Sequence, residues 1–158
     1  MKSQKAFTLL ELLITLALII LLIGISIPSF FAVRKHTNLA KCISRGQQLY
    51  VGAKKMFDDL DPETAKSTEP LSSDMSWWQN RLKAYGIPDE AWYDPTQPKP
   101  TSGDNPDFFY GGVSPKDFHY AEDRDQLYLF IGKNSIYSSG NVVIMADGTV
   151  KFEKFFPE

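Results

Sequence analysis

The apolar residues of this chain are concentrated in one block near its start. Within positions 7–31 the only charged residue is Glu11, and the stretch from Leu12 to Ile27 has none. In a helix that rises 1.5 Å per residue, a block of this length reaches about 37 Å, enough to cross a hydrocarbon core of roughly 30 Å. The pattern therefore predicts a membrane-spanning helix over positions 7–31.

A secretory signal peptide is the main alternative, because it also places basic residues before an apolar core. The apolar core of a signal peptide has roughly 7–15 residues and ends in an Ala-x-Ala cleavage site. Here the block is longer, and the sequence from Pro28 to Ala32 does not resemble such a site. We therefore expect the polar remainder of the chain to stay attached to its membrane segment.

Beyond position 31 the apolar residues keep a helical period and no stop signal intervenes, so one continuous helix is predicted from about Phe7 to Leu60. The apolar stripe of its second half is expected to hold Ala40, Ile43, Tyr50, Ala53, Phe57 and Leu60. The polar face is expected to hold Lys41, Arg45, Gln48, Lys55 and Asp59. The helix thus has a membrane half that is apolar all round and an amphipathic half.

A shorter helix is predicted between Ser73, as its N-cap, and Gly86 just past its end. Its apolar stripe would hold Met75, Trp78, Leu82 and Tyr85. The run from Pro88 to Trp92 predicts one further turn. Positions 94–107 are rich in proline and predict a long surface loop.

The end of the chain predicts strands. The segment Gln126–Ile131 is rich in aromatic and branched residues, and Asp147-Gly148 between two apolar arms predicts a hairpin with a two-residue type I′ turn. From Val150 onward apolar and charged residues alternate, so one face of the hairpin needs a cover. The expected fold class is α+β, with the long N-terminal helix packed on a small C-terminal antiparallel sheet and a short extra helix.

Charge and cysteine content narrow the possibilities further. The formal net charge of −2 disfavours non-specific binding to nucleic acid, and the single cysteine, Cys42, excludes an intrachain disulfide. Lys2 and Lys5 precede the apolar block, whereas Arg34, Lys35, Lys41 and Arg45 follow it. The positive-inside tendency alone would therefore place the large domain in the cytoplasm.

The run Lys5-Ala6-Phe7-Thr8-Leu9-Leu10-Glu11, followed by the apolar block with Pro28 near its far end, resembles the class III leader of type IV pilins and type II secretion pseudopilins. The resemblance implies that a prepilin peptidase on the cytoplasmic side cuts between Ala6 and Phe7 and methylates the new amine. Ala6 stands where the family usually has glycine. The implied organisation is a leader peptide (1–6), a transmembrane and assembly helix (7–31) and an extracytoplasmic pilin-like domain (32–158).

The resemblance also implies assembly roles for Thr8, Glu11 and Pro28. A carboxylate at the centre of a membrane helix costs about 2.5–3.5 kcal/mol, so Glu11 needs a partner. In the family that partner is the amine of a neighbouring subunit, here the amine of Phe7; snorkelling of Glu11 to the headgroups is the alternative. Pro28 removes a hydrogen bond to the Gly24 carbonyl, and both local unwinding on assembly and a tolerated kink stay open.

The implied function is that of a structural subunit of a pseudopilus or type IV pilus-like filament that serves protein secretion. The implied partners are prepilin peptidase, identical or related pilin subunits, an assembly platform and the inner membrane. The chain would cross that membrane once, with its domain in the periplasm, before it enters the filament. The hairpin around Asp147-Gly148 resembles the closing hairpin of pseudopilin-like proteins.

No enzymatic activity and no cofactor are expected. The two histidines, His36 and His119, and Cys42 show no spacing that suggests an acid–base pair. Calcium is the one metal considered, and it would need oxygen ligands from Asp104, Asp107, Glu122, Asp123 and Asp125. None of these runs has the spacing of an EF-hand loop, which favours solvated loop charges.

The alternative function is a membrane-tethered or filament-tip binding module for adhesion or substrate recognition. It is suggested by the proline-rich loop and by three tryptophans that offer stacking surfaces, Trp77, Trp78 and Trp92. Trp78 lies on the apolar stripe and is expected in the core, which leaves Trp77 as the more exposed candidate. Glu11 favours the filament subunit, because initiating tip subunits of the secretion family often lack this residue.

Overall fold

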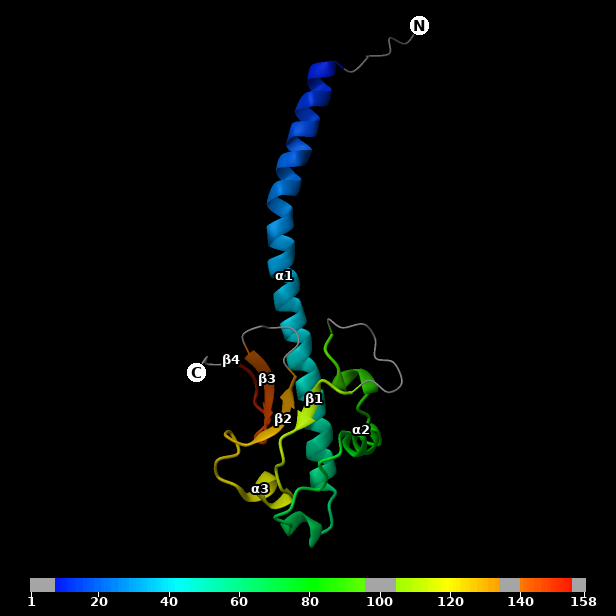
Figure 1. Cartoon of the computed structure of the whole chain (residues 1–158), viewed down its shortest axis with the longest axis vertical. Helices are drawn as coiled ribbons and strands as arrows, with labels where there is room; N and C mark the ends of the chain where they lie inside the picture. The colour runs from blue at the N-terminus through cyan, green and yellow to red at the C-terminus, as the bar shows by residue number, and fades with distance from the viewer. Residues whose placement is uncertain (1–7, 96–104, 134–139, 155–158) are drawn as a thin grey trace. The chain divides into compact units, whose positions relative to one another are not determined.

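The computed structural model describes residues 8–95, 105–133 and 140–154, apart from a few side chains between positions 28 and 35. The chain divides into two compact units, Met1–Asn38 and Leu39–Glu158. Helix α1 (Leu9–Asp58) begins in the first unit and ends in the second (Figure 1). The continuous long helix predicted from the sequence is confirmed.

The second half of α1 is covered by the rest of the second unit. Its buried side chains are those of Cys42, Leu49, Ala53, Met56 and Phe57. The predicted stripe was wrong at Ala40, which is exposed, and Ile43 is only half-buried. It is confirmed at the other positions, since the two half-buried ones pack against the core and the remaining two are buried: Tyr50, Leu60, Ala53 and Phe57. The predicted polar face is confirmed at Lys41, Gln48, Lys55 and Asp59, whereas Arg45 is half-buried and its guanidinium donates to the carbonyl of Tyr93.

Two glycines lie on the buried face of the second half of α1, where the helix approaches its cover closely. A Cβ on Gly46 would lie 3.0 Å from Cγ1 of Val150, and one on Gly52 would lie 2.4 Å from Cγ1 of Ile87. A count of apolar side chains misses such positions, because glycine contributes no side chain to the pattern.

The short 3₁₀ helix η1 (Thr64–Lys66) follows α1, and helix α2 (Met75–Lys83) comes next. The prediction of α2 is confirmed, with Trp78 and Leu82 fully buried, but its N-cap is Asp74 and not Ser73. The Asp74 carboxylate accepts the backbone N–H of Ser76 at 2.9 Å. Gly86, at φ 84°, lies just past the end as expected, and the predicted single turn is the 3₁₀ helix η2 (Asp89–Trp92).

Four strands form an antiparallel sheet in the order of the sequence: β1 (Phe108–Tyr110), β2 (Tyr128–Gly132), β3 (Gly140–Met145) and β4 (Val150–Lys154). The sequence predicted β2, β3 and β4. It did not predict β1, which has three residues, or helix α3 (Pro115–Tyr120) between β1 and β2. The N-terminus of α3 has a readable signal, because the Ser114 hydroxyl accepts the N–H of Asp117 and Pro115 occupies the first turn.

The turn between β3 and β4 differs from the predicted type. A type I′ turn needs positive φ at both central residues, but Asp147 does not have it and Gly148, at φ 94°, does. The N–H of Gly148 donates to the carbonyl of Met145, and the N–H of Met145 donates to that of Thr149. These bonds fit a three-residue loop with glycine at its left-handed position, and the Asp147 carboxylate holds it by accepting the N–H and hydroxyl of Thr149.

The core of the second unit lies between α1, α2, α3 and the sheet, and it is built on aromatic rings. Phe57 of α1 stacks on Phe118 of α3 with ring centroids 4.3 Å apart. Trp78 and Trp92 contact Phe130 of β2 edge to face, at 5.6 and 5.4 Å. The predicted α+β class, in which the sheet covers the amphipathic half of the long helix, is therefore confirmed.

Candidate functional site

The first turn of α1 is closed by reciprocal hydrogen bonds between Thr8 and Glu11. The Glu11 carboxylate accepts the Thr8 backbone N–H at 2.9 Å and the Thr8 hydroxyl at 3.0 Å, and the Glu11 N–H donates to that hydroxyl at 3.2 Å. This is a capping box, in which two N–H groups that a helix start leaves unpaired find partners. The Thr-x-x-Glu spacing that signals it is present in the sequence, although the sequence analysis did not use it.

The box gives Thr8 and Glu11 a joint role that neither has alone. Glu11 is charged at the start of an apolar helix, where negative charge is favoured by the helix dipole. Thr8 holds that carboxylate against the start of the helix. Ala6 and Phe7, the predicted processing residues, lie outside the described residues.

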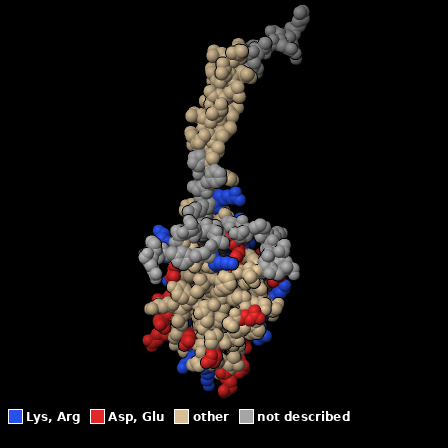
Figure 2. Space-filling model, viewed as in Figure 1, with Lys and Arg blue, Asp and Glu red and all other residues tan. Residues whose placement is uncertain are grey.

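The helix beyond the capping box is long and apolar enough to cross a membrane over Leu9–Ile27. Its large apolar side chains point all round the helix and are 49 to 78% exposed. A soluble monomer rarely leaves such an area open to water, so the segment is compatible with anchoring in a membrane. Figure 2 shows no charged side chain on the visible face of this stretch.

Polar groups within the apolar stretch are satisfied by the helix itself. The hydroxyl of Thr15 donates to the carbonyl of Leu12 at 2.8 Å, and that of Ser26 to the carbonyl of Leu22 at 2.7 Å. Such bonds suit a helix in lipid, where an unpaired hydroxyl is costly. The helix also continues without interruption through Pro28, so this structure shows no unwinding there.

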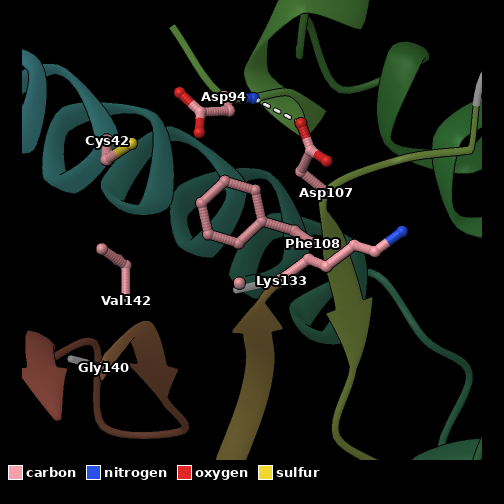
Figure 3. Close-up of a pocket in the computed structure, with 8 residues that line it drawn as sticks. Cys42, Asp94, Asp107, Phe108, Lys133, Gly140 and Val142 are labelled. Carbon is pink, nitrogen blue, oxygen red and sulfur yellow. Dashed lines mark hydrogen bonds between the residues drawn. The ribbon is translucent and has the colours of Figure 1, made fainter. Parts of the chain in front are cut away.

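A small cavity in the second unit is a separate candidate site. It has a volume of about 30 Å³, which holds about one water molecule, and it is lined by Cys42, Asp94, Asp107, Phe108, Gly132, Lys133, Gly140 and Val142 (Figure 3). The N–H of Asp94 donates to the Asp107 carboxylate at 2.8 Å, and the N–H of Asp107 donates to the Trp92 carbonyl, also at 2.8 Å. Asp107 therefore ties together the two ends of the predicted proline-rich loop, whose positions 96–104 lie outside the described residues.

Cys42 is not poised for nucleophilic chemistry in this cavity. Burial, with a further contribution from the negative charge of Asp94, raises the pKa of its thiol to about 12. The thiol is therefore protonated at neutral pH, and only the thiolate is a good nucleophile.

The residues considered for calcium are not brought together in the part of the chain that the structure describes. Asp107 belongs to the loop clasp, and Glu122, Asp123 and Asp125 are exposed between α3 and β2, while Asp104 lies outside the described residues. Within those described ranges no group of three His, Cys, Asp or Glu side chains is placed to hold a metal ion.

The remaining candidate residues are two histidines and three tryptophans. His119 lies within hydrogen-bonding distance of the Phe57 carbonyl near the end of α1, with its Nε2 at 3.2 Å, and His36 is exposed. Trp78 and Trp92 are fully buried, and Trp77 is half-buried with its ring edge-on to Trp78. Two of the three aromatics that suggested a binding module are thus part of the core.

Comparison with known proteins supports the reading of the N-terminus. The family model described as the prokaryotic N-terminal methylation motif matches residues 1–27. No curated protein and no solved structure matches the chain. The matched segment contains the expected cleavage position, the capping box and the whole apolar stretch Leu9–Ile27, and it supports a pilin-type precursor that is processed at its leader.

Proposed function

We propose that this chain, which carries a class III prepilin leader, is a structural subunit of a pseudopilus or type IV pilus-like filament that serves protein secretion. Prepilin peptidase removes residues 1–6 by cutting after Ala6 and methylates the amine of Phe7. Residues 7–31 then anchor the subunit in the inner membrane and later form the filament contacts. Residues 32–158 form the periplasmic domain.

One observation carries this proposal: the leader motif is joined to an apolar helix that its own chain leaves uncovered. Lipid supplies the cover before assembly, and the helices of other subunits supply it afterwards. The same exposed helix is compatible with membrane anchoring.

The capping box adds a step to the assembly mechanism. Before assembly, Thr8 supplies hydrogen bonds to the Glu11 carboxylate, which lowers the cost of holding that charge near lipid. Cleavage creates a positive amine at Phe7, one residue before the box. In the filament the amine of a neighbouring subunit pairs with Glu11, and this amine brings to the carboxylate the full positive charge that the uncharged donors of Thr8 lack.

The experiment that tests the proposal is an intact-mass measurement on the protein purified from cells with active prepilin peptidase. We expect a mass for a chain that begins at Phe7 and carries one methyl group. Ala6→Leu should leave the precursor uncut, because a large side chain replaces the small residue before the cut, and Ala6→Gly is the matched control that should be processed. A full-length chain from Met1 as the only species, or normal processing of Ala6→Leu, would refute the proposed function.

A further inference from the structure

The sheet of the second unit has a groove on the face that turns away from the core. Side chains alternate along β3, so Val142 and Ile144 pack into the core, whereas Asn141 and Val143 lie on the opposite face. The groove has a volume of about 200 Å³. Pockets for small molecules are larger, roughly 300–1,000 Å³, so this groove suits a single side chain of a protein partner. Its lining residues come from three strands: Tyr128, Ile131, Asn141, Val143, Glu153 and Lys154.

The lining of the groove defines the kind of side chain that fits it. Part of the lining is apolar, since Val143 is buried and Ile131 is half-buried. The ring of Tyr128 is fixed beside them, because its hydroxyl donates to the Glu153 carboxylate at 2.9 Å. The amide oxygen of Asn141 is buried and has no hydrogen-bond partner among the described residues, a costly state that a donor from outside would relieve. The groove therefore suits a side chain with an apolar body and a polar tip.

Tyr120, the last residue of α3, has these properties. Its side chain is 66% exposed, more than any other aromatic side chain that the structure describes in the second unit. A tyrosine ring buries a large apolar area at a low cost in conformational entropy, and tyrosine is enriched among the anchor residues of interfaces. Its hydroxyl can both donate and accept, so it can pair with either end of the Asn141 amide.

The charges around the tyrosine and around the groove are complementary. The exposed residues 122–125, just after Tyr120, carry three carboxylates and one guanidinium, which leaves two negative charges. At the groove Lys151 and Glu153 pair at 3.0 Å, and the exposed Lys154 adds a positive charge. Opposite charges on two surfaces favour their encounter and fix their relative orientation.

The tyrosine and the polar part of the groove lie toward opposite ends of the sheet. Helix α3 leads into the start of β2, which pairs with the end of β3 at Tyr128 and Met145 (Figure 1). Asn141 and Lys154 belong to the other end, where β3 begins and β4 ends. Because Tyr120 is exposed, it does not fill the groove of its own domain. A contact between the two surfaces therefore joins two copies head to tail, and such a contact can be repeated along an open chain.

We propose that Tyr120 of one subunit inserts into the sheet groove of a second copy of this chain. Its ring packs against Ile131 and Val143, and its hydroxyl pairs with the Asn141 amide. The contact joins the domains of neighbouring subunits. Its place in a filament rests on the proposed function, whereas self-association through these two surfaces does not. The competing occupant of the groove is a side chain of a different protein.

The test replaces Tyr120 by p-azidophenylalanine in the full chain, which keeps an aromatic ring at this position and makes it photoreactive. Sheared filaments and the purified chain in detergent are both irradiated, and the cross-linked peptides of the dimer are identified by mass spectrometry. We expect the ring to be joined to β2, β3 or β4 of a second copy. The matched control places the same group at the half-buried Tyr85, which should give at least about tenfold less of this dimer.

A variant of the groove separates the contact from folding. Asn141→Leu removes an acceptor that has no partner among the described residues, so the urea midpoint of the full chain should stay the same or rise. The cross-link should fall at least about tenfold, the factor expected for a lost anchor contact. Asn80→Leu, at an exposed position of α2, is the matched control and should keep the cross-link. Lys154→Glu, also at an exposed side chain, should lower the cross-link, so a folding defect in Asn141→Leu would not spoil the test.

The outcomes for this contact and for the proposed function are distinguishable. Filaments that form without the cross-link, or a cross-link to a different protein only, would overturn the contact and leave the filament subunit standing. Unchanged cross-linking in both groove variants would also overturn it. A chain that is never cleaved or assembled but forms the cross-linked dimer in detergent would refute the filament subunit and support the contact.

Discussion

The two halves of α1 contain similar apolar residues but differ in what covers them. In Leu9–Ile27 the large apolar side chains are at least 49% exposed on every side of the helix. In the second half Leu49, Ala53, Met56 and Phe57 are at most 1% exposed, because α2, α3 and the sheet cover them. The difference separates two roles of one helix: under the proposed function its first half contacts lipid and other subunits, whereas its second half forms part of the core of the second unit.

The largest expected effect of this division is on folding. Phe57→Ala should lower the free energy of unfolding of the domain by about 3–5 kcal/mol, because it leaves a cavity beside Phe118 and Trp78. Leu18→Ala, at a side chain that is 54% exposed, should leave it unchanged. Urea unfolding of the full chain in detergent, followed by tryptophan fluorescence, measures both. Similar losses in the two variants would contradict the division.

A smaller effect on the stability of the domain is expected when glycines of α1 are replaced by alanine. Gly52→Ala places a methyl group 2.4 Å from Ile87 and should cost about 1–3 kcal/mol of domain stability, despite the better helix propensity of alanine. Gly24→Ala meets no atom within 4 Å and should leave the domain as stable as the wild type. The same unfolding experiment measures both variants, and a destabilised Gly24→Ala or an unaffected Gly52→Ala would show that the two halves are not separated in this way.

Cys42, which lies at the start of the buried stripe of α1, should make the stability of the domain depend on pH in the alkaline range. The pKa of Cys42 is raised to about 12 by burial in the fold, whereas an exposed thiol has a pKa of about 8.5. The unfolded state therefore loses this proton first, so stability is retained below about pH 8.5 and falls as the pH rises toward 12. Unfolding of the wild type and of Cys42→Ala between pH 8 and 11 should show a shallower decline in the variant. An equal decline would mean that the thiol does not stay protonated in the fold.

Sequence reasoning predicted the parts of this structure that depend on long or strongly patterned segments. The continuous α1, the stripe of Trp78 and Leu82 and the closing hairpin all follow from local period and turn residues. It failed where tertiary contacts decide, since β1 is a strand only because Phe108, Phe109 and Tyr110 pair with β2. It also misplaced part of the stripe of α1, whose buried face holds Cys42, Leu49 and Met56 together with two glycines that add no apolar side chain to the pattern.

The candidate site shows the same contrast between what sequence patterns predict and what only the structure reveals. The sequence identified Thr8 and Glu11 as important, but through a family resemblance, and their mutual hydrogen bonds became clear only in the structure. The loop clasp of Asp94 and Asp107 joins residues on either side of a proline-rich segment, and no local pattern predicts that their backbone and carboxylate would meet.

The most direct test of the filament mechanism is the incorporation of Glu11→Gln into filaments, measured as the fraction of subunit in the sheared filament preparation. Glutamine preserves the capping box, since it also accepts the Thr8 N–H, but it removes the charge that the neighbour's Phe7 amine requires. We expect normal membrane levels, normal cleavage and a folded domain, with incorporation reduced at least tenfold and to the same extent as in Glu11→Ala. Wild-type incorporation of Glu11→Gln beside a defective Glu11→Ala would show that Glu11 acts by capping the helix, and would contradict charge pairing between subunits.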